Sequence, residues 1–229
     1  MIYILTPRLT CIYSHINGRI IADIGTDHAY IPIELAKNNK IDRAFACDIN
    51  KGPCDIARSN IKNEGFEDVI EVRLGGGLSV IDEGEADEII IAGMGGKLIS
   101  EIIAADIATA KASRLILQPM NAQAELRKFL LENGFEITAE DLETEGFKVY
   151  NIFTAQKGTQ KPYENEIDRH IPPVLYSHRC IDHLIHKKTR EFTKILTGLK
   201  RSSEPQAERI AECEMLLAEL EKIREKKGK

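Results

Sequence analysis

The first 157 residues alternate between short apolar runs and longer stretches with helical spacing. Apolar runs rich in β-branched residues predict strands at 19–25, 43–49, 69–75, 86–93 and 114–119. Helical spacing of the apolar positions predicts helices at 30–37, 51–65, 96–108 and 122–134. Strands that alternate with helices in this way form βαβ crossovers. The pattern therefore predicts a parallel sheet with helices on both faces.

Residues 135–157 interrupt this alternation. They contain two strand-like stretches with no helix between them, separated at about Glu145 and Gly146. Adjacent strands joined by a short turn pair in antiparallel fashion, so this segment is predicted to close one edge of the sheet. The predicted fold is a Rossmann-like α/β sheet of seven strands whose last pair is antiparallel.

The C-terminal part carries apolar positions at heptad spacing. One predicted helix presents a seam that includes a lysine: Ile181, Ile185, Lys188, Phe192, Ile195 and Leu199. A second presents Ile210, Cys213, Leu217 and Leu220, after an interruption at 202–205. Two such seams joined by a short turn predict an antiparallel helical hairpin. We therefore expect two domains, 1–159 and 160–229; the hairpin could also simply support the first domain or form a dimer contact.

Composition narrows the class of protein. The chain is 43% hydrophobic, which is enough for a buried core, and no apolar run approaches the ~20 residues of a membrane span. The N-terminus lacks the features of a signal peptide, so we expect a cytoplasmic protein, either a monomer or a weak homodimer. Five scattered cysteines without a C-x-x-C pair indicate neither a zinc site nor a disulfide framework, so no metal is predicted.

Charge is divided unevenly along the chain. The net charge is −5, but residues 160–229 hold 15 Lys and Arg against 12 Asp and Glu. Residues 1–159 are therefore strongly acidic, and the C-terminal part is mildly basic. Such an asymmetry is a weak indication of a polyanionic partner.

The turn after the first predicted strand reads "DIGTDHAYIP" (23–32). A strand–turn–helix unit of this kind offers backbone amides and a helix N-terminus to a ligand. Asp23 and Asp27 bracket the turn, however, and carboxylates there would repel a phosphate. They suit a ligand that carries a sulfonium or ammonium group. The alternative is an ordinary strand–helix junction in which Asp27 is the N-cap.

Asp48 ends the second predicted strand, 25 residues after Asp23. This offset is close to the roughly 20 residues at which an acidic side chain meets a ribose hydroxyl pair. Together with the first turn, it indicates an adenosyl ligand, either NAD or S-adenosylmethionine. Asp27 favours S-adenosylmethionine because a dinucleotide phosphate would lie against its carboxylate.

The ends of the third and fourth predicted strands are rich in glycine. In "RLGGGL" (73–78), three glycines allow the backbone to approach a flat ligand, but Gly76 stands where many class I methyltransferases have an Asp for the adenine amino group. In "AGMGGKL" (92–98), the Asn or Asp followed by Pro-Pro that amino-directed enzymes carry is absent. An exocyclic amine is therefore disfavoured as methyl acceptor. A ring nitrogen such as adenine N1 needs mainly correct positioning.

Four motifs together resemble the bacterial tRNA (adenine(22)-N1)-methyltransferases: "DIGTDHAYIP", "RLGGGLSV", "AGMGGKLI" and "LILQPM". The resemblance extends to the C-terminal helical hairpin. It implies a class I methyltransferase domain with a coiled-coil-like appendage. It also implies S-adenosylmethionine as methyl donor, tRNA as substrate, and N1 of an adenine in the D-arm region as the acceptor.

The resemblance carries site roles to positions of this chain. The cofactor is expected to lie against Asp23, Gly25, Thr26, Asp27, Asp48, Ile49, Asn50, Gly75, Gly76, Gly77, Leu78, Gly93 and Met94. The candidate catalytic residues are Asp27, His28 and, from an N-terminal helix, Arg8. A carboxylate would favour the positive charge of N1-methyladenosine.

Basic residues cluster on the first C-terminal helix and could bind tRNA: Lys187, Lys188, Arg190, Lys194, Lys200 and Arg201, with a further basic run in "KIREKKGK" (222–229). A solvated helix face is the alternative explanation for such a run. Two other functions stay open from the residues alone. One is a small-molecule methyltransferase with the hairpin as a lid, and the other is a non-catalytic RNA-binding relic of the fold.

Overall fold

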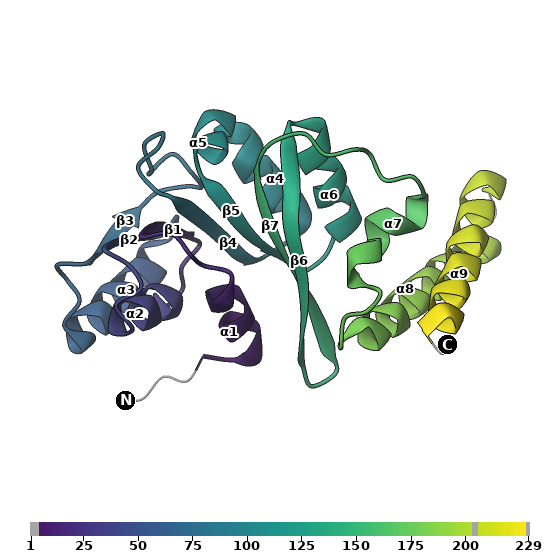
Figure 1. The fold of residues 1–229 in the computed structure, drawn as a ribbon, viewed down its shortest axis with the longest axis horizontal. Helices are drawn as coiled ribbons and strands as arrows, with labels where there is room; N and C mark the ends of the chain where they lie inside the picture. Colours follow the sequence, from purple (N-terminus) through teal and green to yellow (C-terminus); the bar gives the residue numbers. More distant parts are fainter. Residues whose placement is uncertain (1–4, 203–205, 228–229) are drawn as a thin grey trace.

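A computed structural model describes residues 5–202 and 206–227 of the chain. Its centre is one seven-stranded sheet in the order β3-β2-β1-β4-β5-β7-β6 (Figure 1). The strands are β1 (Ile20–Ile24), β2 (Arg43–Asp48), β3 (Ile70–Leu74), β4 (Glu88–Met94), β5 (Arg114–Pro119), β6 (Phe135–Glu145) and β7 (Lys148–Lys157). β1 to β5 pair in parallel, and β7 lies antiparallel to both β5 and β6. The predicted sheet and its antiparallel edge are confirmed.

Helices cover both faces of this sheet, as the alternating pattern predicts. They are α1 (Pro7–Ser14), α2 (Tyr30–Lys37), α3 (Lys51–Glu64), α4 (Gly96–Ala105), α5 (Ile107–Ala112) and α6 (Gln123–Glu132). One apolar core joins α1, α2 and α3 to one face, and a second joins α4, α5 and α6 to the other (Figure 1). The two cores hold the sheet between helix layers, so its carboxyl edge is left for the loops.

The single helix predicted at 96–108 is two helices. α4 ends at Ala105, and Asp106 leaves the helical conformation with φ −145° and ψ 76°. Its side chain accepts a hydrogen bond from the Thr109 backbone N–H at 3.1 Å and so caps α5. An Asp that can satisfy the first amides of a new helix therefore divides a continuous apolar pattern.

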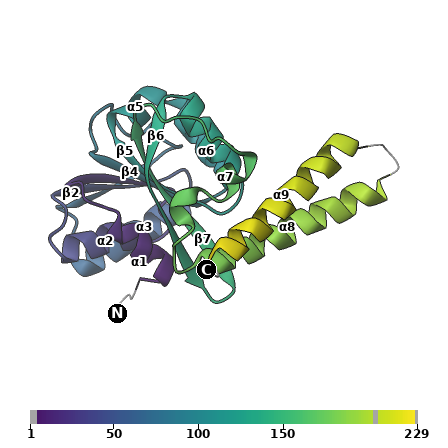
Figure 2. The same ribbon diagram turned by 45° about the vertical axis from the view of Figure 1, so that its right-hand side comes forward.

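The C-terminal region contains α7 (Glu166–His170), a 3-10 turn (Pro173–Leu175), α8 (Ile181–Arg201) and α9 (Ala207–Lys227). α8 and α9 pair side by side and project from the α/β body (Figure 2). The predicted helical hairpin is thus confirmed; residues 203–205 of its expected turn lie outside the described residues. The seam of α9 is Cys213, Leu216, Leu220 and Ile223. Leu217, predicted as a seam position, is only half-buried.

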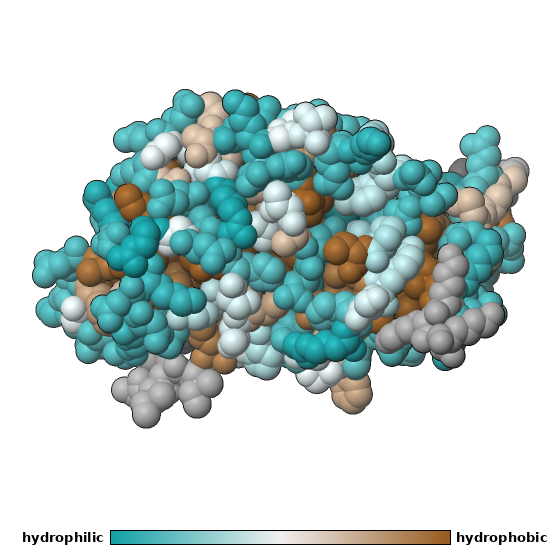
Figure 3. Space-filling view, viewed as in Figure 1, coloured by the Kyte–Doolittle hydropathy of each residue, from teal (hydrophilic) through white to brown (hydrophobic). Residues whose placement is uncertain are grey.

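A third apolar core joins the hairpin to the sheet. It includes Leu142 of β6 and Val149 of β7 together with buried residues of α7, α8 and α9. Hydrophobic side chains gather over this region on the face shown in Figure 3. The expected domain boundary at residue 159 is therefore crossed by this third core, which packs residues from both sides of the boundary together.

A buried arginine strengthens the same junction. The Arg127 guanidinium, fully buried on α6, donates from Nε to Glu140 Oε1 at 3.0 Å and from Nη1 to the Arg169 carbonyl at 2.7 Å. These contacts tie α6 to β6 and to α7.

Among the described helices, none is long and apolar enough to cross a membrane.

Candidate functional site

The carboxyl ends of β1, β2 and β3 form one continuous rim. Because these strands are parallel, the loops that follow them leave the sheet at the same edge, where open α/β sheets bind ligands. The backbone N–H groups of Gly25 and Thr26 donate to the Cys47 carbonyl at 2.8 and 2.9 Å. The Gly75 N–H donates to the Asp48 carbonyl at 2.9 Å. Backbone hydrogen bonds thus bring the three predicted binding loops together.

Two carboxylates, those of Asp23 and Asp48, lie near each other on this rim. Asp23, at the end of β1, is 9% exposed. Burial raises the pKa of Asp23 to about 6, a hydrogen bond from Thr26 opposes this rise, and the nearby Asp48 carboxylate adds to it. Asp48 is half-buried, and its Oδ1 accepts the Asn50 backbone N–H at 2.7 Å. The acidic lining predicted from sequence is present in the fold, and it disfavours a phosphate group here.

The first turn is capped by Thr26. Its Oγ1 accepts the Ala29 backbone N–H at 3.2 Å, and Ala29 is the N-cap of α2 in a left-handed conformation, with φ 56°. The alternative in which Asp27 is the N-cap is therefore wrong. The side chain of Asp27 is 72% exposed instead, and its carboxylate lies 3.1 Å from His28 Nε2. The His28 ring stacks on Tyr30 with centroids 4.9 Å apart.

Glycines allow neighbouring side chains to approach the backbone closely at two parts of the rim. Gly25 has φ +79°, and a Cβ there would lie 2.0 Å from Met94 Cε, so the first turn and the end of β4 are in direct contact. A Cβ on Gly76 would lie 3.3 Å from Ile49 Cδ1. Ile49, directly after Asp48, is 69% exposed. A carboxylate followed by an exposed apolar side chain, with Gly76 close to that side chain, can hold the ribose and the flat base of an adenosyl group.

Arg8 reaches the rim from α1, which begins at Pro7 after the N-cap Thr6. The Arg8 backbone N–H donates to Glu145 Oε1 at 2.9 Å, and its Nη1 donates to Gln118 Oε1 at 2.8 Å. The structure thus brings Asp27 and His28 together, while the Arg8 side chain is held by Gln118.

The sequence reasoning missed Gln118, which is fully buried at the end of β5. Its Oε1 also accepts the backbone N–H of Gly93 at 3.2 Å; Gly93 has φ +77° and lies at a β-bulge near the end of β4. The signal was a polar residue at the carboxyl end of an otherwise apolar strand. Tyr150 was missed as well; its ring lies 5.6 Å from the Arg8 guanidinium carbon.

Comparison with known proteins identifies this arrangement. A family profile described as "Methyltransferase domain" matches residues 5–153. A tRNA (adenine(22)-N(1))-methyltransferase of Bacillus subtilis is 41% identical over 157 residues, which are 67% of this chain and 66% of that protein. The match thus spans slightly less than two thirds of that relative's length.

Solved structures extend the similarity to the C-terminal helices. A Streptococcus pneumoniae protein, a candidate tRNA (m1A22) methyltransferase, is 31% identical, with 96% of this chain and 99% of that chain covered and a TM-score of 0.85. The chain belongs to the tRNA (adenine(22)-N(1))-methyltransferase family. The same S. pneumoniae protein in complex with S-adenosyl-L-methionine gives a TM-score of 0.83 at 31% identity, with the same coverage of 96% and 99%. The helical appendage is therefore part of the family fold.

The predicted tRNA-binding residues of this family member have different environments. Lys187, Arg190 and Lys194 line one groove beside α8. Lys188 is only 3% exposed and its Nζ lies 3.0 Å from Glu191 Oε2, which corrects its prediction as a phosphate contact. Lys200 Nζ lies 2.7 Å from Glu214 Oε1 of α9, within the helical hairpin.

Arg201, at the end of α8, is exposed. The predicted basic run at 222–229 belongs partly to α9, but the side chains from residue 226 onward lie outside the described residues. The structure therefore describes only the first part of that prediction.

The groove has further members that the charge pattern did not reveal. Phe147, His183, His186 and Arg224 also line it. Phe147 is fully exposed at the tip of the β6–β7 hairpin. The same tip carries Glu145, whose Oε1 accepts the Arg8 N–H, so the hairpin connects the groove with α1.

Proposed function

We propose that this chain transfers a methyl group from S-adenosylmethionine to N1 of adenine 22 in tRNA. The observation that carries the proposal is the 41% identity to the B. subtilis enzyme across the domain that contains the rim. The proposal assigns residues 1–159 to catalysis and 160–229 to tRNA binding. A tRNA substrate also agrees with a cytoplasmic location, and we propose that the chain acts as a monomer or weak homodimer.

S-Adenosylmethionine fits the donor set of the rim. Asp48 would accept from the ribose hydroxyls, and the exposed Ile49 with Gly76 would hold the adenine ring. Asp23, Gly25, Thr26 and Met94 would surround the methionine part, and the remaining predicted contacts, Asn50, Gly75, Gly77, Leu78 and Gly93, complete the same loops. The backbone approach at Gly76 replaces the usual Asp contact. When bound, the cofactor supplies an electrophilic methyl group on a sulfonium.

We propose that Asp27 is the principal catalytic residue. Adenine N1 has an available lone pair, so the protein has to position the base and stabilise the cation that forms. The exposed Asp27 carboxylate provides a negative charge at the rim. His28 Nε2, at 3.1 Å, orients that carboxylate, and the stack of His28 on Tyr30 fixes the imidazole.

Arg8 is better explained as a positioning residue. Its guanidinium donates to Gln118, and Gln118 in turn holds the Gly93 N–H. Replacement of Arg8 would therefore disturb the bulged end of β4, beside which the methyl acceptor would lie. This role differs from direct action on the substrate.

The groove beside α8 is the proposed tRNA surface. Arg190 and Lys194 present cations that can contact phosphates, which dominate protein–RNA affinity. Phe147 can stack on a base that has been splayed out of the tRNA, as single-stranded RNA bases do on aromatic side chains. A nucleotide bound in the groove would then reach the rim by passing the tip of the β6–β7 hairpin.

Two assays separate this proposal from its alternatives. Calorimetry with S-adenosylmethionine is expected to show binding, whereas a non-catalytic relic would give no heat. Transfer of tritiated methyl from the cofactor to bulk tRNA is then expected. Cofactor binding without incorporation into any tRNA pool would favour a small-molecule methyltransferase.

A further inference from the structure

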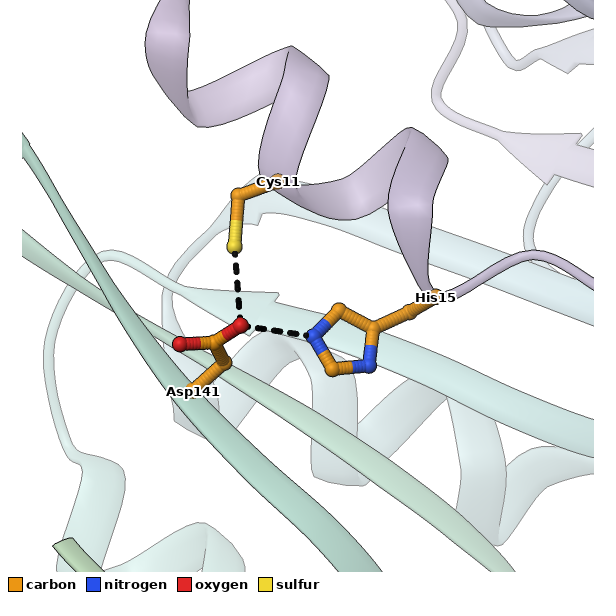
Figure 4. A group of neighbouring side chains, drawn as sticks. All are labelled: Cys11, His15 and Asp141. Carbon is orange, nitrogen blue, oxygen red and sulfur yellow. Dashed lines mark hydrogen bonds and ion pairs between the residues drawn. The ribbon is translucent and has the colours of Figure 1, made fainter. Parts of the chain in front are cut away.

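Three side chains with different metal-binding atoms converge where α1 packs on β6 (Figure 4). Cys11 lies on α1, His15 is the C-cap of that helix, and Asp141 lies on β6. Asp141 Oδ2 lies 3.5 Å from Cys11 Sγ and 3.1 Å from His15 Nε2, and the three ligand atoms all lie within 4.8 Å of one another. None of the three residues belongs to the rim formed by the ends of β1, β2 and β3.

Two of these separations, 3.5 and 3.1 Å, are close to those of a tetrahedral zinc site, and the remaining pair, Cys11 Sγ and His15 Nε2, lies within 4.8 Å. With bonds of about 2.0–2.3 Å, neighbouring ligand atoms around zinc lie about 3.2–3.7 Å apart. A thiolate, an imidazole and a carboxylate are also ligand types that Zn²⁺ accepts, whereas Ca²⁺ and Mg²⁺ prefer oxygen ligands alone. The geometry and the donor set therefore both point to zinc.

The second oxygen of Asp141 is held by an outer layer of hydrogen bonds. Its Oδ1 accepts the Leu142 backbone N–H at 2.8 Å and lies 2.7 Å from His178 Nε2. The Cys180 backbone N–H donates to His178 Nδ1 at 3.0 Å. Neutral His178 therefore carries its proton on Nε2 and donates to Asp141, which leaves Oδ2 directed at Cys11 and His15.

The His15 ring also has an outer hydrogen-bond partner. Its Nδ1 lies 3.4 Å from Thr154 Oγ1. Metal-binding histidines commonly donate their second ring N–H to such an outer partner, which fixes the tautomer that binds through Nε2. The ligand set and its supporting hydrogen bonds are thus both in place.

We propose that Cys11 Sγ, His15 Nε2 and Asp141 Oδ2 bind one Zn²⁺ ion, with water in the fourth position and His178 as the outer partner of Asp141. On binding, the Cys11 thiol loses its proton to solvent. The single proton of neutral His15 resides on Nδ1, facing Thr154. The thiolate and the carboxylate balance the charge of the ion.

The ion would join three parts of the chain. α1 and its C-cap supply two ligands, β6 supplies one, and His178 precedes α8. The side chain of Asp141 is about a third exposed, which provides a route for the ion. Because Arg8 belongs to the same short helix as Cys11, zinc would also hold the helix that carries Arg8 to the rim.

The test uses the full chain, freed of metal with a chelator and then titrated with Zn²⁺ alone. About one ion per chain is expected, with a rise in the thermal unfolding midpoint. Titration with Co²⁺ alone is expected to give thiolate-to-cobalt charge transfer and the intense visible bands of a tetrahedral site. Cys11→Ser and His15→Gln are expected to lose more than 100-fold in Zn²⁺ affinity, and His178→Gln about 10- to 100-fold.

Cys213→Ser removes a different buried cysteine, on α9, and serves as the matched control. It is expected to retain the stoichiometry and the cobalt spectrum of the original chain. Absence of a stoichiometric ion, or equal binding by Cys11→Ser and the original chain, would overturn the proposal. A folded Cys11→Ser variant, checked by circular dichroism, makes either result decisive.

Discussion

The Arg8 guanidinium donates to the buried Gln118 Oε1 at 2.8 Å, and the same oxygen accepts the Gly93 backbone N–H at 3.2 Å. One amide side chain thereby joins the N-terminal helix, the end of β5 and the bulged end of β4. Arg8 and Gln118 are 110 residues apart in the sequence. The end of β4, beside the proposed acceptor position, depends on this link.

Replacement of Gln118 by Leu is expected to slow methyl transfer about 10- to 100-fold, because a small misplacement of the reacting groups is costly. Arg8→Ala is expected to have a similar effect. Single-turnover rates of both variants and of the double variant test the link. The double variant should be little worse than either single one. Additive losses would show that Arg8 acts independently of Gln118.

Asp27→Asn is expected to lower the rate of transfer by about 100-fold or more, since it removes the charge that favours the methylated, cationic base. The fold should be unchanged, because the side chain is 72% exposed. The rate at saturating tRNA and the thermal unfolding midpoint are measured together. Asp55→Asn, another exposed carboxylate, is the control. Turnover of Asp27→Asn at the original rate would remove Asp27 from its proposed role.

The fold follows from local patterns, and the strand order of the sheet from the usual topology of such crossovers. The strand at 114–119 was predicted with its bounds intact because its apolar run ends at a polar residue and a proline. Contacts between distant residues leave no comparable trace. The spacing of the five cysteines does not reveal that folding places Cys11 beside Asp141, 130 residues away.

Lys188 illustrates the limit of charge counting. It belongs to a run of basic residues, but it also occupies a seam position of its helix. That position buries its side chain, which is only 3% exposed. Gln118 shows the opposite case, because the apolar pattern of its strand concealed a buried polar residue that links Arg8 to Gly93.

Arg190→Gln is expected to weaken tRNA binding several-fold and to lower the slope of log affinity against log salt by about one, as the loss of one phosphate contact does. Lys188→Met, at the buried neighbour, should leave both quantities unchanged. Lys128→Gln on α6 controls for loss of an exposed cation elsewhere. Filter binding over a range of salt concentrations measures the tRNA affinity and the salt slope of all three variants. Equal effects of Arg190→Gln and Lys128→Gln would contradict a specific groove.

Acid stability is expected to depend on Glu85, which supports the loop after β3. Hydrogen bonds from Arg73 lower the pKa of Glu85 from 4.5 to about 2, despite the opposing effect of burial. A carboxyl group whose pKa is lower in the folded state stabilises the fold above its ordinary pKa, and this contribution is lost as pH falls toward the folded value. The loss should therefore occur between about pH 4.5 and 2.

Glu85→Gln is expected to unfold more readily at neutral pH and to lack this part of the acid dependence. Urea unfolding at several pH values measures it, with the exposed neighbour Glu83→Gln as control. An identical pH dependence for Glu85→Gln and the original chain would show that the Arg73 pair does not support the loop.

Mapping the modified nucleotide directly tests the proposed methylation of adenine 22 at N1. A tRNA transcript is incubated with the full chain and S-adenosylmethionine and then reverse-transcribed, because a methyl group on N1 blocks the base-pairing edge of adenine. We expect a stop at adenine 22 that disappears with Asp27→Asn or when that base is replaced by guanine. Uninterrupted read-through of a transcript that has incorporated methyl groups would contradict it.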